Sequence, residues 1–277
     1  MTKKYLLLFI LLFGILNACK QKEVKMNASE EHIILATNYQ IQADFINAQK
    51  EYELAIKADT NNYKAYFGLA GTLQYLGYFR GALLNYSKAI ELNPKFTMAY
   101  LSRANLESQL GDEKACVRDF KKTIENKKDF FMPYYFKGQM EYGKGNYKQA
   151  IDDLTDAINL RSDFYMLYSM RGSSRFKLKD YTGAIADFDL EIKTMPTHVL
   201  GYINRAFAYA EIKNYRSALL DINTAINIDP TWSQAYIYKG VIYNKLNIKD
   251  SACLQFRYAD KMHNPQAANY IKEICGK

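Results

Sequence analysis

The sequence predicts an all-α fold of seven consecutive helix–turn–helix repeats, each 34 residues long, followed by a short capping helix. This prediction rests on three columns of residues, each with one member every 34 residues. The columns stay in register from residue 48 to residue 270, which is typical of a repeat architecture. The first column is tyrosine: Tyr66, Tyr100, Tyr134, Tyr168, Tyr202, Tyr236 and Tyr270. The second is small: Ala48, Ala82, Cys116, Ala150, Ala184, Ala218 and Ala252. The third is mostly apolar: Tyr52, Tyr86, Phe120, Leu154, Phe188, Ile222 and Phe256.

Residues 1–18 have the pattern of a secretory signal peptide. Lys3 and Lys4 precede the apolar run YLLLFILLFGIL (5–16), which is shorter than the roughly 20 apolar residues of a spanning helix. The following LNAC (16–19) resembles the bacterial lipobox, in which a signal peptidase cuts before a cysteine that carries lipid. Asn17 departs from the usual lipobox residue, so an ordinary signal peptide or an uncleaved anchor stays open as an alternative. The resemblance implies lipidation of Cys19 and a tether at 19–28.

Each repeat contains two runs with apolar residues at helical spacing, separated by turn segments such as LGYF, KGNY and LKDY. The small-residue column predicts a close approach of the two helices, and Pro94, Pro196 and Pro230 fall where second helices end. Ser29, followed by Glu30 and Glu31, predicts the start of the first helix. The repeats are expected at 29–62, 63–96, 97–130, 131–164, 165–198, 199–232 and 233–266, with the capping helix at 267–277.

The stretch AYFGLAGTLQYLGYFRGALLNYSKAIELNP (65–94) resembles the tetratricopeptide repeat (TPR) in its order of aromatic, small, Ala and Pro positions. The resemblance extends over all seven repeats. It implies two antiparallel helices per repeat, stacked into a right-handed superhelical solenoid. It also implies a concave groove lined by the first helix of each repeat.

Three cysteines follow Cys19, namely Cys116, Cys253 and Cys275. This odd number allows at most one intramolecular disulfide. Cys116 stands in the small-residue column and Cys253 at the neighbouring apolar position, which predicts that both are buried. A Cys253–Cys275 disulfide that holds the capping helix stays open as an alternative.

Two charged columns predict structural ion pairs. A basic residue stands three positions after the tyrosine in the middle four repeats, and an aspartate follows each base by sixteen residues. In an antiparallel helix pair, residues equally far from the turn lie at the same height, so a charge-assisted hydrogen bond is expected within a repeat or to a neighbouring one. The predicted pairs are Arg103 with Asp119, Lys137 with Asp153, Arg171 with Asp187 and Arg205 with Asp221.

Composition and motifs argue against catalysis and nucleic-acid binding. The net charge is +8, but Lys and Arg are spread among acids rather than gathered in a stripe. GQMEYGKG (138–145) mimics a phosphate-binding loop but lacks its Ser or Thr and a preceding strand. The histidines, His32, His198 and His263, form no pair at metal-binding spacing. We therefore expect no enzyme activity, metal, cofactor, nucleic acid or small-molecule substrate.

The TPR resemblance places the variable first-helix positions in the groove. These positions are apolar, aromatic and rich in methionine, which suits an adaptable site for an apolar peptide or an amphipathic helix. They lack the Lys and Asn of TPR domains that grip a terminal carboxylate. The alternative, that Met98, Met132 and Met166 only pack between first helices, stays open. The predicted partner-binding residues are Phe67, Met98, Leu101, Asn105, Met132, Tyr135, Gln139, Tyr142, Met166, Ser173, Phe176, Leu200, Ile203, Phe207 and Ile237.

The predicted function is a non-catalytic protein–protein interaction scaffold that binds a partner segment in this groove. The lipobox resemblance implies a lipid anchor in the bacterial cell envelope, on the outer membrane facing the periplasm. The alternative function is a periplasmic chaperone-like helper that holds apolar peptides or unfolded clients.

Overall fold

The computed structural model describes residues 27–276, and all regular structure in this range is helical, as the sequence predicts. The predicted signal peptide at 1–18 and the predicted lipidation site, Cys19, lie outside the described residues. Between residues 27 and 276, no helix is long and apolar enough to cross a membrane. The chain falls into two compact units, one ending at Leu106 and the other beginning at Glu107.

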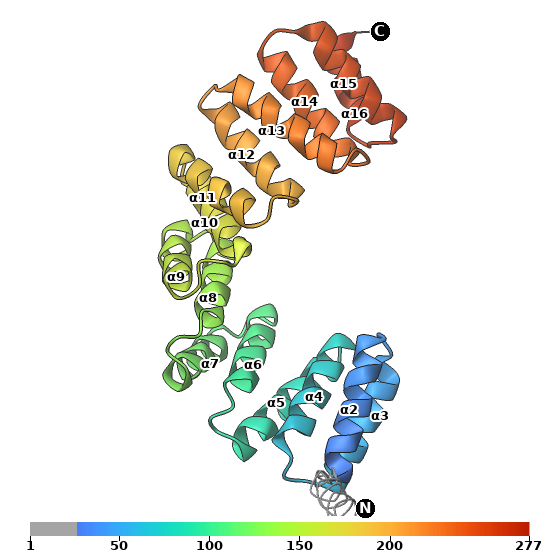
Figure 1. The fold of residues 1–277 in the computed structure, drawn as a ribbon, viewed down its shortest axis with the longest axis vertical. Helices are drawn as coiled ribbons and strands as arrows, with labels where there is room; N and C mark the ends of the chain where they lie inside the picture. The colour runs from blue at the N-terminus through green and yellow to red at the C-terminus, as the bar shows by residue number, and fades with distance from the viewer. Residues whose placement is uncertain (1–26, 277) are drawn as a thin grey trace, which may run out of the picture. The chain divides into compact units, whose positions relative to one another are not determined.

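In the first unit, consecutive helices form antiparallel pairs (Figure 1). Ala36, Tyr52 and Leu69 belong to one buried cluster, and Ala70, Ala82, Tyr86 and Leu106 to a second. The helices are α2 (Ala28–Ile41), α3 (Phe45–Ala58), α4 (Tyr63–Tyr75), α5 (Phe79–Leu92) and most of α6 (Thr97–Gln109).

The second unit continues the alternation of first and second helices to the end of the chain (Figure 1). Its helices are α7 (Glu113–Asn126), α8 (Met132–Gly143), α9 (Tyr147–Leu160), α10 (Tyr165–Lys177), α11 (Tyr181–Thr194), α12 (Val199–Glu211), α13 (Tyr215–Ile228), α14 (Ser233–Lys245), α15 (Lys249–Lys261) and α16 (Ala267–Tyr270).

The turn inside each helix pair has the same backbone conformation at the same repeat position. One residue in each turn has a positive φ, which is 82° at Gly145 and 65° at Lys179. Glycine adopts this left-handed conformation without steric cost, and it ends the first helix of the pair. The side chains of Asp112, Asp180 and Asn214 then cap the helix that follows. The seven residues with a positive φ in these turns are Ala43, Gly77, Gly111, Gly145, Lys179, Lys213 and Asn247.

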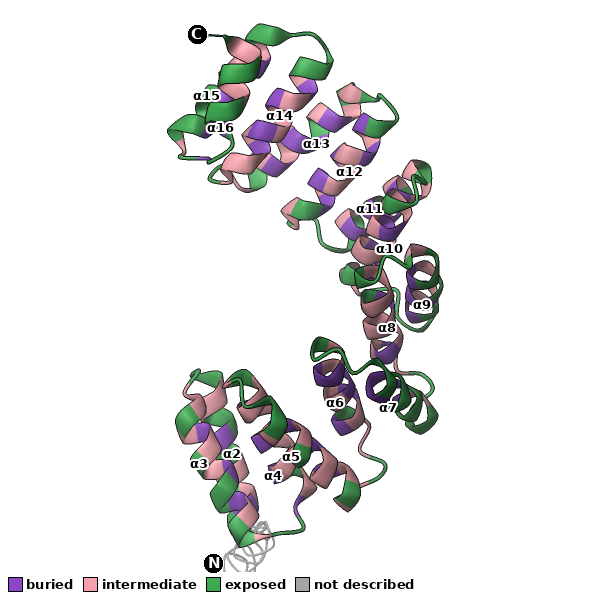
Figure 2. Cartoon of the chain, turned by 180° about the vertical axis from the view of Figure 1, so that it is seen from behind, coloured by how far each residue is buried: buried purple, intermediate pink, exposed green. Residues whose placement is uncertain are grey.

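The small-residue column lies where the two helices of a pair touch. All seven members, Cys116 included, are fully buried. The larger third column fills the same interface, and Figure 2 shows buried residues concentrated on the helix faces that meet other helices. The contact is close enough to require glycine at position 172, where an added Cβ would lie 2.7 Å from Cε1 of Phe188.

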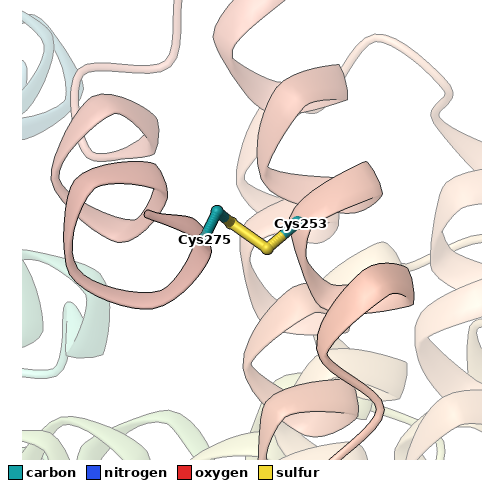
Figure 3. Close-up of a disulfide and its surroundings, with 2 residues drawn as sticks. All are labelled: Cys253 and Cys275. Atoms are coloured by element: carbon teal, nitrogen blue, oxygen red, sulfur yellow. A yellow bond between two sulfur atoms is a disulfide. The ribbon is translucent and has the colours of Figure 1, made fainter. Parts of the chain in front are cut away.

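The end of the chain differs from a simple capping helix. After α16, residues Ile271–Cys275 form a π-helical turn, and Tyr270 and Ile274 pack on the buried cluster around Phe256. The wider turn continues to Cys275, whose sulfur is bonded to that of Cys253 in α15 (Figure 3). The structure thus has the Cys253–Cys275 disulfide that the sequence leaves open as an alternative, and Cys253 is half-buried rather than buried as predicted.

Candidate functional site

The charged columns form contacts between the two helices of a repeat. Nζ of Lys137 lies 2.6 Å from Oδ1 of Asp153, and Nη2 of Arg205 lies 2.6 Å from Oδ1 of Asp221. Nη2 and Nε of Arg171 both donate to Asp187, the shorter contact being 2.7 Å. Arg103 and Asp119 stand in different compact units, so their pairing stays a prediction.

The arginines also connect consecutive repeats. Nη1 of Arg171 donates to Oγ1 of Thr155 at 3.1 Å, and Nη1 of Arg205 donates to Oδ1 of Asp189 at 2.6 Å. Each acceptor precedes its arginine by sixteen residues and stands on the second helix of the preceding repeat. Each guanidinium group thus joins two helix pairs, and few of its N–H groups remain to donate to a ligand.

The electrostatics of these pairs are those of a partly buried scaffold. The three aspartate side chains are at most 4% exposed. Burial raises the pKa of Asp153, and the ammonium of Lys137 opposes this shift. The hydrogen bond to Asp221 raises the pKa of Arg205. We therefore interpret these residues as structural, since their charges are satisfied inside the protein.

Two adjoining cavities lie along α8, α10 and α12 of the second unit, apart from a larger apolar pocket of about 540 Å³ on α7 and α8. The first, of about 240 Å³, is lined by Tyr135, Tyr142, Tyr165, Met166, Ser169, Met170, Ser173 and His198. The second, of about 230 Å³, is lined by Tyr142, Ser173, Phe176, Lys177, Phe188, Asn204 and Phe207. Because Tyr142 and Ser173 belong to both, the cavities form one continuous depression, which we call the aromatic groove.

The aromatic groove combines ring faces with a few polar atoms. The Tyr135 hydroxyl donates to the sulfur of Met166 at 3.9 Å, and burial raises the pKa of Tyr135. The ring of Tyr142 packs edge-on against that of Tyr147, with centroids 5.4 Å apart. No Asp or Glu is among the residues that line the two cavities, whereas Lys177 and His198 are. The walls of the groove therefore combine aromatic and apolar surface with hydroxyl, amide, imidazole and ammonium groups.

Six of the residues predicted to bind a partner line the aromatic groove. They come from three consecutive first helices and meet because those helices lie beside one another in the stack. They are Tyr135, Tyr142, Met166, Ser173, Phe176 and Phe207. Met166 is 39% exposed, so its side chain is not fully covered by the adjacent first helices.

Three predicted residues are buried instead, and the expectation that they line an open groove is wrong. Leu101, Ile203 and Ile237 are at most 3% exposed. Ile203 belongs to the core cluster with Ala206 and Ile222, and Ile237 to that around Phe256. These aliphatic side chains are short enough to be covered by the neighbouring helices, so they contribute to folding and offer no surface to a partner.

The other predicted residues lie outside the two cavities. Met132 packs against the core cluster of α8 and α9, as the packing alternative expects. Gln139 and Leu200 are exposed, and in the first unit Met98 is 42% exposed. Asn105 is half-buried, and Phe67 packs against the rings of Tyr86 and Phe96. For these residues a role in partner binding stays a prediction.

The structure adds groove residues that are absent from the predicted set. Tyr165 and Met170 stand on α10, and Lys177 ends that helix. Ser169, also on α10, lines the groove at the register position of Tyr135 and Ile203, so the repeat pattern does indicate it although the predicted set omits it. Asn204 stands on α12, and His198 is the N-cap residue of the same helix. Position 204 is two residues after the repeat tyrosine. The set of predicted partner-binding residues contains no residue at this position of a repeat. His198 is the last residue of the fifth predicted repeat, and the repeat pattern does not indicate its approach to the groove.

No cluster of three or more metal-ligating His, Cys, Asp or Glu side chains occurs between residues 27 and 276.

Comparisons with known proteins agree with this architecture. The profile of the tetratricopeptide repeat matches residues 63–96 and 133–164. A search of the curated proteins gave no match. Among solved structures, the chain is similar to a tetratricopeptide repeat protein from Parabacteroides merdae, with 19% identity, 89% of this chain and 98% of that chain covered, and a TM-score of 0.61.

Two further structures are similar. The C-terminal part of a TPR repeat-containing protein from Cytophaga hutchinsonii is 16% identical, with 87% of this chain and 98% of that chain covered and a TM-score of 0.70. YrrB, described as a TPR protein with an unusual peptide-binding site, is 21% identical, with 68% and 97% covered and a TM-score of 0.58. At such identities the likeness shows the fold alone. Residues 63–96 and 133–164 are thus tetratricopeptide repeats, and the chain has the fold of tetratricopeptide-repeat proteins.

Proposed function

We propose that the chain is a non-catalytic interaction scaffold that holds a short segment of a partner protein in the aromatic groove. The observation that carries this proposal is the continuity of the two cavities over α8, α10 and α12. A stack of first helices offers an extended surface on which one segment contacts several repeats. YrrB, a protein of similar fold, is described as having an unusual peptide-binding site, which supports peptide binding by a protein of this fold.

The side chains of the groove suit a partner segment with apolar residues. Tyr142 and Tyr165 present large rings with few rotatable bonds, and such rings make strong anchors at protein interfaces. Met166 and Met170 add flexible, polarizable side chains that adapt to different shapes. The groove is open along its length rather than enclosed around one small molecule, which favours a chain segment as the ligand.

We further propose that the scaffold works in the bacterial cell envelope, attached through a lipidated Cys19. The lipobox-like LNAC supports the anchor. The Cys253–Cys275 disulfide supports an oxidising compartment, since disulfides persist in exported and periplasmic proteins and are rare in the cytosol. A chaperone-like role in the same compartment differs in one respect, because it requires capture of many unrelated apolar segments rather than one.

The groove is tested with the double variant Tyr142→Ala/Met166→Ala. Both side chains line the groove and neither is fully buried, although Tyr142 also packs against the core cluster around Leu154. Thermal melting therefore has to show that the variant keeps its fold while the contact area is lost. We expect crosslinking and pull-down from cells that express the full chain to recover a defined partner with the wild type. The variant should recover at least about tenfold less, because two interface anchors are truncated.

A matched control is Val117→Ser/Ile124→Ser. These residues line a separate apolar pocket formed by α7 and α8, so the control removes a similar amount of apolar surface elsewhere. Capture should be unchanged in the control. Equal loss in both double variants, or none in the groove variant, would reject the groove. Recovery of many unrelated proteins with a common apolar motif would favour the chaperone-like function.

The anchor is tested with Cys19→Ala. Cells given labelled palmitate should incorporate the label into the wild-type chain and not into the variant, because thioether and amide attachment both require Cys19. Membrane fractions should lose the variant as well, since acyl chains supply the attachment. Cys116→Ala, which changes a buried thiol, should leave labelling intact. Label retained in Cys19→Ala would exclude lipidation at this residue.

A further inference from the structure

One polar cluster interrupts the regular pattern between the fifth and sixth repeats. Glu191 stands in a column that is otherwise small: Ala55, Ala89, Thr123, Ala157, Ala225 and Ala259. His198 stands in a column whose neighbours are aromatic: Phe96, Phe130, Phe164 and Trp232. Gly201 replaces the Ala or larger residue of its own column: Ala65, Ala99, Pro133, Leu167 and Ala235. Three departures at one junction point to a shared cause.

The three residues touch one another. Nδ1 of His198 lies 2.7 Å from Oε1 of Glu191, whose side chain is completely buried. An added Cβ at Gly201 would lie 3.2 Å from Oε1 and Cδ of that carboxyl group, so glycine makes room for it. The ring of His198 packs edge-on against that of Tyr165, with centroids 4.9 Å apart. Glu191 and Gly201 thus hold the imidazole in one orientation.

This arrangement costs stability relative to the chain's own pattern. Burial raises the pKa of Glu191, and the contact with His198 opposes this shift. A buried ion pair is often no more stable than apolar residues of similar size, and three other junctions have Ala with an aromatic ring, namely Ala89 with Phe96, Ala157 with Phe164 and Ala225 with Trp232. Local departures of this kind are expected where a protein binds a ligand. The imidazole is 26% exposed and lines the aromatic groove.

We propose that His198 is the polar anchor of the aromatic groove and that it binds a carboxylate of the partner segment. This inference rests on the proposed function of the groove. Glu191 occupies Nδ1, so Nε2 is the atom left for a ligand, and between residues 27 and 276 it has no hydrogen-bond partner. In its imidazolium form, His198 donates Nε2–H to the carboxylate. The partner segment then has an Asp or Glu beside its apolar residues.

The groups that face His198 favour an anionic ligand. Tyr165 and Ser169 on α10 and Tyr135 and Tyr142 on α8 line the same cavity and have hydroxyl groups. Lys177, in the adjoining cavity, is the nearest cation of the groove lining. Glu191 on α11 is the acid in contact with His198, and its buried carboxyl group also interacts with the side chain of Ser169. A charged imidazole donates to a carboxylate more strongly than a neutral one, so binding of the carboxylate should strengthen as the pH falls.

The experiment uses three fluorescein-labelled nonapeptides that share the same Leu and Phe residues and differ only in a central Glu, Gln or Lys. The full chain is held in phosphatidylcholine nanodiscs, and affinity is measured by fluorescence anisotropy at pH 6 and pH 8. We expect the Glu peptide to bind about tenfold more tightly than the other two at pH 6, which is the gain from one charge-assisted hydrogen bond. This preference should shrink at pH 8.

The matched variant is Glu191→Ala/His198→Phe/Gly201→Ala, which restores the chain's own repeat pattern. It should melt at the same or a higher temperature and bind the three peptides equally at both pH values. Lys177→Gln removes the other groove cation and should keep the pH dependence. Equal affinity of the wild type for the three peptides, at any level including none, overturns the inference. Loss of capture in Tyr142→Ala/Met166→Ala would then still support the groove itself.

Discussion

Asp187→Ala is expected to lower the free energy of unfolding by about 3–5 kcal/mol, the usual cost of removing one partner of a buried ion pair. The Asp187 side chain is 1% exposed and accepts hydrogen bonds from Arg171 and from Nη1 of Arg175, the latter at 2.8 Å. Without the carboxylate, Arg171 loses its counter-ion and keeps only the hydrogen bond to Thr155, while Arg175 keeps a longer contact with Asp180. Urea unfolding followed by circular dichroism measures the loss.

The control for this prediction is Asp163→Ala. Asp163 also pairs with an arginine, since its Oδ1 lies 2.8 Å from Nε of Arg161, but the two side chains are 72% and 51% exposed. Exposed pairs contribute about 0–1 kcal/mol because water and salt screen them. Equal losses in the two variants would mean that the Asp187 contacts are not what holds α10 and α11 together.

Phe188→Ala should cost a similar amount, about 3–5 kcal/mol, through loss of burial and the cavity that remains. Phe188 is 1% exposed and packs with Ala184 and Ala208, which belong to two successive repeats. Its ring also lies against the backbone at Gly172, so close that a side chain on residue 172 would collide with the ring. The free energy of unfolding from urea titration, with unchanged helical content at zero urea, measures the effect.

The chain supplies the control itself, because the same column contains Leu154. Phe188→Leu keeps most of the buried volume, so its expected cost is below about 1.5 kcal/mol. A cost for Phe188→Leu as large as that for Phe188→Ala would show that ring shape rather than filled volume stabilises this interface.

Much of the scaffold could be predicted because a fixed period determines height along a helix pair. A base and an aspartate sixteen residues apart stand equally far from the turn, and the contacts of Arg171 and Arg205 follow from this register. The same argument places the small-residue column at the closest approach of two helices, where every member is buried.

The exposure of groove residues could not be predicted in the same way. Register fixes the direction of a side chain but not how closely the next repeat covers it. Tyr135 and Ile203 occupy the same register position, yet Tyr135 reaches into a cavity while Ile203 is 2% exposed in the core. The size of the side chain and of its neighbours on adjacent helices decides the outcome.

Two other features depend on contacts that no repeat column contains. The Cys253–Cys275 disulfide requires the π-helical turn that ends the chain, and nothing in the repeat pattern predicts that turn. The cluster of Glu191 and His198 was detectable in principle, since Glu191 breaks a column of small residues. The column does not show, however, that the buried carboxyl group contacts His198, a residue of the groove.

The most direct test of the central claim is site-specific photo-crosslinking in living cells. A photoreactive phenylalanine replaces Tyr142, which lines both cavities of the aromatic groove, or Val117, which lines the pocket of α7 and α8. If the groove captures a partner, position 142 should crosslink to one defined segment of it, identified by mass spectrometry. Position 117 should not crosslink to that segment. Identical crosslinks at the two positions, or none at position 142, would contradict the account.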